Sequence, residues 1–127
     1  MDLLLDTHVF LWWDSDEPHL GAAARAAITD PANRIYVSAA SIWEVAIKRA
    51  KGKLSFSGSP SEAVDRNGFE ALSIAAAHAE TAADLDWDHV DPFDRMLVAQ
   101  ALNRSLILVH ADSRIAEFPT VPQLWAR

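Results

Sequence analysis

Short apolar segments alternate with helix-forming segments along this chain, and this alternation constrains its fold more than any other feature. Strands are predicted at residues 3–5, 35–37, 69–74 and 106–109, with a candidate edge strand at residues 119–122. Segments this short and apolar suit strands that are buried on both faces of a sheet. Helices are predicted at residues 9–13, 20–28, 38–50, 61–67, 75–85 and 91–103, with a helical turn near Ile115.

Strands that alternate with helices join through right-handed crossovers, which set parallel strands side by side and cover both faces of the sheet. We therefore predict an α/β fold with a mainly parallel sheet of four to five strands. The chain has 127 residues and is expected to form a single domain over residues 1–127. In such folds ligands bind outside the carboxyl ends of the strands.

The composition excludes several classes of protein. The chain has no cysteine, which excludes a disulfide scaffold and a thiolate metal site and fits a reducing compartment. No secretory signal is evident and no apolar run approaches the length of a membrane span, so we expect a cytoplasmic protein. The net charge of −7 argues against nucleic acid as a partner. Bound divalent cations would offset that charge, however, and a compact basic run is formed by Lys48, Arg49, Lys51 and Lys53.

The segment at residues 91–102 begins with a pattern typical of a helix N-terminus. Asp91 suits the N-cap and Pro92 suits the first helical position. Asp94 lies one turn in, above Val98 and Ala101, so a carboxylate stands on the apolar stripe of the helix. A buried charge without a partner is costly, so a positive group is expected to meet it. The alternative is that Asp94 only closes a capping box with Asp91.

Three further acids occupy comparable positions. Asp6 ends the first strand, Asp112 follows the strand at residues 106–109, and Glu44 lies in the early turns of the helix after the second strand. A helix that starts at Asp91 and runs antiparallel to the strands brings Asp94 to the same edge. Each acid also has a structural alternative: Asp6 and Asp112 as helix caps, and Glu44 as a capping-box partner of Ser41 or an ion-pair partner of Lys48.

Four carboxylates that converge repel one another and need cations. All-oxygen ligands suit Mg²⁺ or Mn²⁺. Such a site can activate water and stabilise charge on a phosphoryl oxygen. Metal-assisted hydrolysis of phosphodiesters is the predicted chemistry.

Four segments, in this order, resemble the PIN-domain ribonucleases, and within them the VapC-type toxins of type II toxin–antitoxin modules. They are Leu-Leu-Leu-Asp-Thr-His-Val-Phe-Leu-Trp, Ser-Ile-Trp-Glu-Val-Ala-Ile-Lys, Asp-Pro-Phe-Asp-Arg-Met-Leu-Val-Ala-Gln-Ala and Leu-Val-His-Ala-Asp. The resemblance implies a three-layer α/β/α sandwich and a Mg²⁺- or Mn²⁺-dependent endoribonuclease that cleaves RNA. It also implies a cognate VapB-type antitoxin, and a homodimer is expected.

Carried over by position, the resemblance assigns the catalytic and metal-binding quartet to Asp6, Glu44, Asp94 and Asp112. Asp6 and Asp94 are the surest metal ligands, and the other two complete the site directly or through water. This chain has His110 where the family usually has Thr or Ser, two residues before the last acid. The imidazole either reaches RNA or a water at the metal, or serves a structural role, and the structural role is favoured.

Substrate contacts are predicted at Arg95, which follows a metal-site acid, and at Lys48 in the basic run. For Lys48 the alternative is a solvated helix end. The large apolar side chains Trp12, Trp13 and Trp43 are expected in the core, or at an antitoxin or dimer surface.

Other functions fit less well. A phosphatase of the haloacid-dehalogenase type requires a second Asp where this chain has His8, and a response-regulator receiver requires a late Lys, whereas none follows Lys53. The remaining alternative is a non-catalytic metal-binding or protein-interaction α/β domain.

Overall fold

The computed structural model describes residues 1–127 and contains one five-stranded sheet. Every pair of neighbouring strands is parallel, and the order across the sheet is β3-β2-β1-β4-β5. The predicted α/β fold is thereby confirmed, with a sheet that is parallel throughout. The strands are β1 (Asp2–Leu5), β2 (Arg34–Ser38), β3 (Glu70–Leu72), β4 (Ile107–His110) and β5 (Gln123–Trp125).

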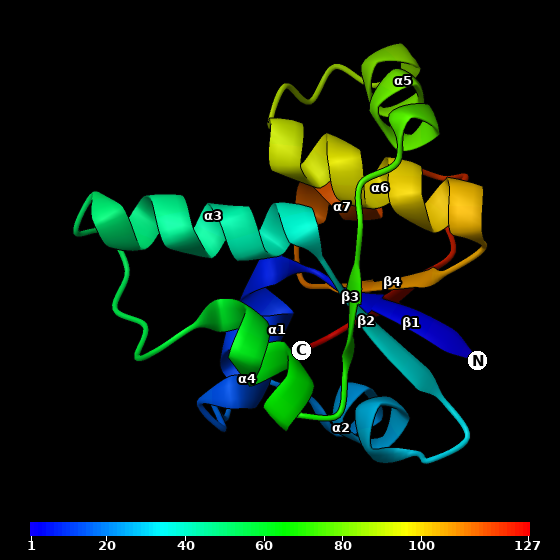
Figure 1. The fold of residues 1–127 in the computed structure, drawn as a ribbon. Helices are drawn as coiled ribbons and strands as arrows, with labels where there is room; N and C mark the ends of the chain where they lie inside the picture. The colour runs from blue at the N-terminus through cyan, green and yellow to red at the C-terminus, as the bar shows by residue number, and fades with distance from the viewer.

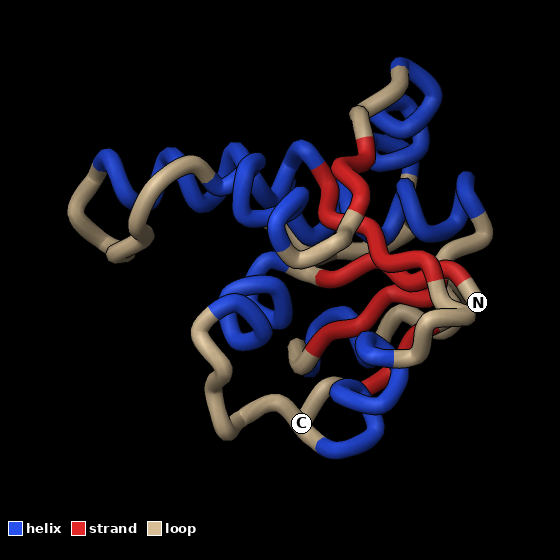
Figure 2. Tube along the Cα trace, turned by 60° about the horizontal axis from the view of Figure 1, so that its bottom comes forward, coloured by secondary structure: helices blue, strands red, loops and turns tan.

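Seven helices cover the sheet on both faces, which confirms the three-layer α/β/α sandwich (Figure 1). Helices α1, α2 and α4 lie on one side and α5, α6 and α7 on the other, while α3 extends beyond the sheet edge. Figure 2 shows the strands side by side between these two layers. The helices are α1 (Thr7–Asp14), α2 (Ala22–Thr29), α3 (Ala39–Ala50), α4 (Pro60–Arg66), α5 (Ala76–Asp84), α6 (Pro92–Arg104) and α7 (Ser113–Ala116).

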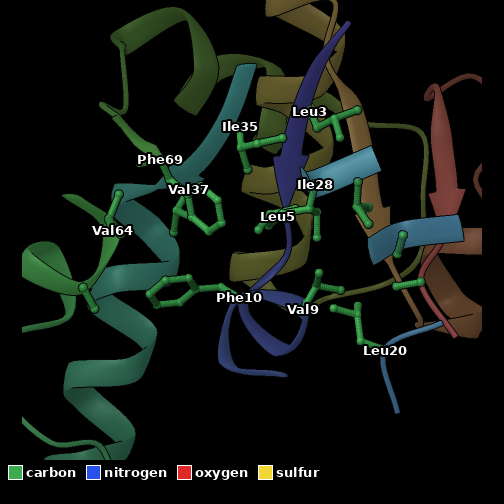
Figure 3. Packing of buried hydrophobic residues seen from close by; sticks show 14 residues of the cluster. Leu3, Leu5, Val9, Phe10, Leu20, Ile28, Ile35, Val37, Val64 and Phe69 are labelled. Atoms are coloured by element: carbon green, nitrogen blue, oxygen red, sulfur yellow. The ribbon is translucent and has the colours of Figure 1, made fainter. Parts of the chain in front are cut away.

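Alternation along the strands builds two hydrophobic cores, one on each face of the sheet. Leu3 and Leu5 of β1 point into the core beneath α1, α2 and α4, where Phe10 of α1 also lies (Figure 3). Leu4 points to the opposite core, with Leu97 of α6. Successive side chains of a strand face opposite sides, so a run of three leucines can serve both cores only in the middle of a covered sheet. The central position of β1 follows from this pattern.

The prediction of an edge strand at residues 119–122 is wrong. The edge strand lies immediately after that segment and begins at Gln123. Prolines at 119 and 122 have no N–H to donate to a ladder. The carbonyl of Pro122 accepts a hydrogen bond from the N–H of Leu108 at 2.9 Å, and the β4–β5 pairing continues from Gln123. The other predicted strands and helices are all present, with ends shifted by one or two residues.

Helix α6 begins as its sequence predicts. The Asp91 side chain accepts hydrogen bonds from the N–H groups of Phe93 and Asp94, and Pro92 occupies the first turn. The helix packs against α5 and presents Leu97, Val98 and Ala101 to the core. It therefore carries Asp94 at its N-terminal end, close to where β1 and β4 end. No helix of the chain is both long enough and apolar enough to cross a membrane.

Candidate active site

Asp6 directly follows β1, the central strand, and is the most buried acid of the predicted quartet, with 5% of its surface exposed. Its Oδ1 accepts a hydrogen bond from the N–H of Val9 at 2.8 Å, so the residue caps α1 as one alternative proposed. This bond engages only one of the two carboxylate oxygens. Burial raises the pKa of Asp6 to about 7, although the Val9 hydrogen bond acts in the opposite direction.

The other three acids lie close enough for their charges to act on Asp6. After burial, the charges of Asp94, Asp112 and Glu44 contribute to the raised pKa of Asp6. Burial also raises the pKa of Asp94, and the charges of Asp91 and Asp112 act in the same direction. The four predicted acids, from four separate segments of the chain, thus lie near enough for their charges to interact, whereas the ligand atoms found within 4.8 Å of one another belong to His89, Asp91 and Asp94.

Glu44 differs from the other acids because both of its oxygens are occupied by protein groups. The hydroxyl of Thr7 donates to Oε1 at 2.6 Å, and Nζ of Lys48 donates to Oε2 at 2.7 Å. The capping box with Ser41 is absent, because Ser38 caps α3 and Ser41 lies inside the helix. The ion pair with Lys48 is present, as the other alternative for Glu44 proposed.

Asp94 meets a histidine that the sequence analysis did not single out. Nε2 of His89 lies 2.7 Å from Oδ2 of Asp94, and this hydrogen bond lowers the pKa of Asp94 against the effect of burial. His89, Asp91 and Asp94 each offer one possible ligand atom, and these atoms lie within 4.8 Å of one another. The sequence signal that could have identified His89 is the His-x-Asp-x-x-Asp spacing at the start of the helix.

Asp112 caps the short helix α7 through Oδ1, which accepts from the N–H of Arg114 at 2.8 Å. His110 holds the segment before it. Its Nδ1 accepts from the N–H of Asp112 at 3.1 Å, and its Nε2 lies 2.7 Å from Oε1 of Gln123 on β5. His110 is buried, and burial lowers its pKa. The favoured structural role for His110 therefore agrees with its contacts: it fixes the backbone of Asp112 against the edge strand.

The family pattern of the PIN domain matches residues 3–121. The chain belongs to the PIN-domain family. The matched segment includes all four acids of the candidate site. No curated protein sequence matches the chain significantly.

Solved structures with the same PIN fold are components of toxin–antitoxin assemblies. VapBC2 from Rickettsia felis, bound to a DNA fragment from its promoter, is 14% identical with a TM-score of 0.72, covering 98% of each chain. DNA-bound VapBC from Salmonella typhimurium is 18% identical with a TM-score of 0.67, over 98% of this chain and 97% of that one. A toxin–antitoxin complex from Klebsiella pneumoniae is 18% identical with a TM-score of 0.67, over 97% and 96%. At these identities the likeness establishes the fold.

The donor set of this PIN domain fits a hard divalent cation. Asp6, Asp94 and Asp112 each use one carboxylate oxygen in a hydrogen bond with the protein, which leaves the other oxygen available. Burial chiefly, and the charges of neighbouring acids in addition, raise the pKa values of Asp6 and Asp94, and a cation among the acids would offset both effects. Oxygen donors without thiolates favour Mg²⁺ or Mn²⁺ over softer metals.

The two cations predicted to contact substrate have protein partners in this PIN domain. The guanidinium of Arg95 donates to five backbone carbonyls, those of Ala82, Ala83, Leu85, Trp87 and His89. It therefore joins the end of α5 and the following loop to α6, and its donors do not face open solvent as a substrate-binding group would require. Lys48 is 41% exposed and pairs with Glu44.

The three tryptophans have separate environments. Trp13 packs against the core near Phe69, with ring centroids 6.1 Å apart. Trp43 is 62% exposed and lies edge-on to Phe93 at 5.6 Å. Trp12 lines a cavity beside Asp6, together with His8 and Arg127. Neither His8 nor Arg127 was predicted as a site residue. The two are far apart in the sequence, and nothing in the local sequence indicates that they line the same cavity.

Proposed function

We propose that this PIN domain is a Mg²⁺- or Mn²⁺-dependent endoribonuclease that acts in the cytoplasm as the toxin of a toxin–antitoxin pair. The observation that carries the proposal is the electrostatic state of Asp6. Its pKa is raised to about 7 by burial and by three neighbouring acids, so the charged form of Asp6 is unfavourable in the folded protein unless a cation binds beside it. Capping a helix requires only one acceptor near the helix N-terminus, and does not by itself require three further acids nearby.

Asp6 and Asp94 are the proposed principal metal ligands, completed by Asp112 and Glu44. A divalent cation bound there supplies activation of water and stabilisation of negative charge on the phosphoryl oxygens of RNA. The chain's own residues prepare the site: His89 orients Asp94, His110 fixes the backbone of Asp112, and Thr7 with Lys48 holds Glu44. Supporting contacts of this kind restrict the rotamers of metal-site carboxylates.

The proposed partner is a VapB-type antitoxin, and the proposed assembly contains a toxin homodimer. Support for the antitoxin partner comes from the similar structures, which are VapBC complexes. An apolar hollow lined by Trp43, Ile74, Phe93 and Met96 offers surface for such contacts, and Trp43 and Phe93 are sequence neighbours of Glu44 and Asp94. Trp43 and Ile74 are exposed in the single chain, at 62% and 41%.

The decisive experiment incubates the purified chain, freed of any partner, with a mixed RNA pool and Mg²⁺ or Mn²⁺. Asp94→Asn, an EDTA control and the exposed-acid control Asp84→Asn are run beside the wild type. We expect cleavage by the wild type and Asp84→Asn only, with loss in EDTA. Mn²⁺ should also raise the melting temperature of these two proteins and leave that of Asp94→Asn nearly unchanged.

Absence of both cleavage and metal-induced stabilisation would contradict the proposal. The acids would then be helix caps and sheet-edge residues, and a protein-interaction domain would be the better interpretation. Stabilisation without cleavage would support a non-catalytic metal-binding domain.

A further inference from the structure

A cavity of about 330 Å³ opens beside two acids of the candidate site. Asp6 and Asp112 form one side of it, and His8 and Trp12 of α1 form another. Arg127, which follows β5, also lines it. The cavity therefore joins the proposed metal site to a cation and an aromatic ring, and neither of these has a part in the proposed metal chemistry.

The backbone that carries Arg127 is firmly held. Ala126 is fully buried; its N–H donates to the carbonyl of His110 at 2.8 Å, and its carbonyl accepts from the N–H of Gly21 at 2.7 Å. Gly21 packs so closely that a Cβ at this position would lie 2.6 Å from the carbonyl carbon of Arg127. Figure 1 shows the segment after β5 running towards α1. The position of Arg127 at the cavity is thus set by tertiary packing.

Arg127 is also the arginine near the site that has neither a side-chain hydrogen bond nor an ion pair. Arg95 is saturated by backbone carbonyls, Lys48 pairs with Glu44, and Arg114 pairs with Asp88 at 2.6 Å. Arg127 is exposed and takes part in no ion pair, although Asp6 and Asp112 line the same cavity. An arginine that is held beside acids and left without a partner is suited to bind an incoming anion.

The aromatic wall adds a surface for a nucleoside. Trp12 is half-buried, and its ring stacks on His19 at 5.7 Å with an interplanar angle of 25°. His8 is exposed, and its ring centroid lies 6.3 Å from that of Trp12. Aromatic side chains bind the unstacked bases of single-stranded RNA, whereas bases paired in an A-form helix are not available to them.

We propose that Arg127, Trp12 and His8 form a nucleotide subsite for single-stranded RNA next to the cleaved bond. Arg127 binds the adjacent phosphate, because its planar guanidinium matches two phosphate oxygens, and Trp12 with His8 contacts the attached nucleoside. The subsite rests on the proposed nuclease function and extends it to residues outside the acidic quartet.

The test compares Arg127→Gln with Arg34→Gln, which removes the same charge at the opposite edge of the sheet. Fluorescence anisotropy measures the affinity of a short labelled single-stranded RNA, with each variant made in an Asp94→Asn background that does not cleave. We expect Arg127→Gln to weaken binding about 10-fold and to reduce the slope of log affinity against log salt by about 0.7, the value for one lost phosphate contact on a single strand. Arg34→Gln should change neither quantity by more than twofold.

Cleavage assays in the active background provide a separate measurement. Arg127→Gln should raise KM about 10-fold and change kcat less than twofold, because Arg127 touches a flanking phosphate. If the wild type does not cleave but the anisotropy result holds, the nuclease proposal fails, and Arg127 is then part of a site that binds RNA without cleaving it. Unchanged affinity and salt slope for Arg127→Gln overturn the subsite, whether or not the chain cleaves RNA. Weaker binding of a partner protein with unchanged RNA affinity would likewise assign Arg127 to that partner and overturn it.

A second variant tests the position of Arg127 without touching its side chain. Gly21 has φ −73°, which alanine adopts readily, so Gly21→Ala acts through the clash with the backbone of Arg127. We expect it to weaken RNA binding, and the double variant Gly21→Ala with Arg127→Gln to be no weaker than Arg127→Gln alone. Full additivity of the two effects would contradict the subsite.

Discussion

Nε2 of His89 and Oδ2 of Asp94 lie 2.7 Å apart, so the acid at the start of α6 has a hydrogen-bond partner from the loop just before the helix. A positive group was expected to meet this carboxylate, and the group that meets it is an imidazole. The loop is itself anchored, because Arg95 donates to the carbonyl of His89 at 3.0 Å and the Trp87 ring packs against the His89 ring at 4.8 Å. Asp94 is thus oriented before any ligand arrives.

Removing this partner should weaken metal binding. His89→Ala deprives Asp94 of the hydrogen bond that lowers its pKa, so a proton competes better with the cation at neutral pH. We expect the Mn²⁺ affinity measured by calorimetry to fall about 10-fold at pH 7. The deficit should shrink as the pH rises, and His89→Gln, which keeps a donor, should recover part of it. A higher affinity in His89→Ala would show that His89 competes with the cation.

Asp6 should make the metal-free protein less stable as the pH rises. Its pKa is raised from 3.8 to about 7 in the folded protein, so between these values the folded state binds a proton that the unfolded state has lost. The contribution of Asp6 to the free energy of unfolding is therefore greatest below pH 4, and it falls by roughly 4 kcal/mol by the time the pH exceeds 7.

Asp6→Asn isolates this effect, because an asparagine oxygen can still accept from Val9. In EDTA, urea denaturation should find the variant and the wild type similar near pH 4 and the variant more stable at pH 8. Addition of Mn²⁺ at pH 8 should stabilise only the wild type. A wild type that gains stability relative to Asp6→Asn between pH 4 and 8 in EDTA would show that Asp6 is not destabilised by its surroundings.

Arg95 is predicted to stabilise the fold and not to bind substrate. Arg95→Leu leaves as many as five backbone carbonyls without their donor, and we expect a loss of about 2–4 kcal/mol in the free energy of unfolding. Arg95→Lys should recover little, because a single ammonium cannot reach the same set of carbonyls. Arg66→Leu, at a side chain that is 65% exposed, is the matched control and should cost less than 1 kcal/mol. If Arg95→Leu is stable and shows a reduced salt dependence of RNA binding, Arg95 contacts the substrate as the sequence analysis predicted.

His110 is predicted to be a neutral imidazole that carries its proton on Nε2. Its Nδ1 accepts from the N–H of Asp112, and its burial lowers the pKa. Nitrogen NMR at pH 6.5 should therefore show mainly the Nε2-protonated tautomer. His110→Ala should lower the free energy of unfolding by about 2–4 kcal/mol, because Gln123 and the N–H of Asp112 lose their partner in a buried setting. A mainly charged ring at this pH would contradict the assignment.

The local sequence was sufficient to predict most of the fold. Three consecutive leucines at 3–5 predict a strand covered on both faces, and Asp91-Pro92 predicts the start of α6, because period and capping are properties of neighbouring residues. The positions of the acids relative to the strands could also be predicted from the local sequence. Their placement at one edge of the sheet then followed from the prediction that the strands are parallel. The edge strand was misplaced, since its position depends on where the prolines leave N–H groups free to pair with β4.

The partners of the site residues were decided by tertiary structure alone. Thr7 and Glu44 are separated by 37 residues, and the sequence contains no signal that their side chains share a hydrogen bond. Arg95 and Arg127 look alike as exposed cations in the sequence, yet folding saturates one with carbonyls and leaves the other at a cavity beside Asp6. Hydrophobic pattern specifies which elements form, but hydrogen bonds and charges act over a few ångströms, so only the packed chain determines which groups come within that range.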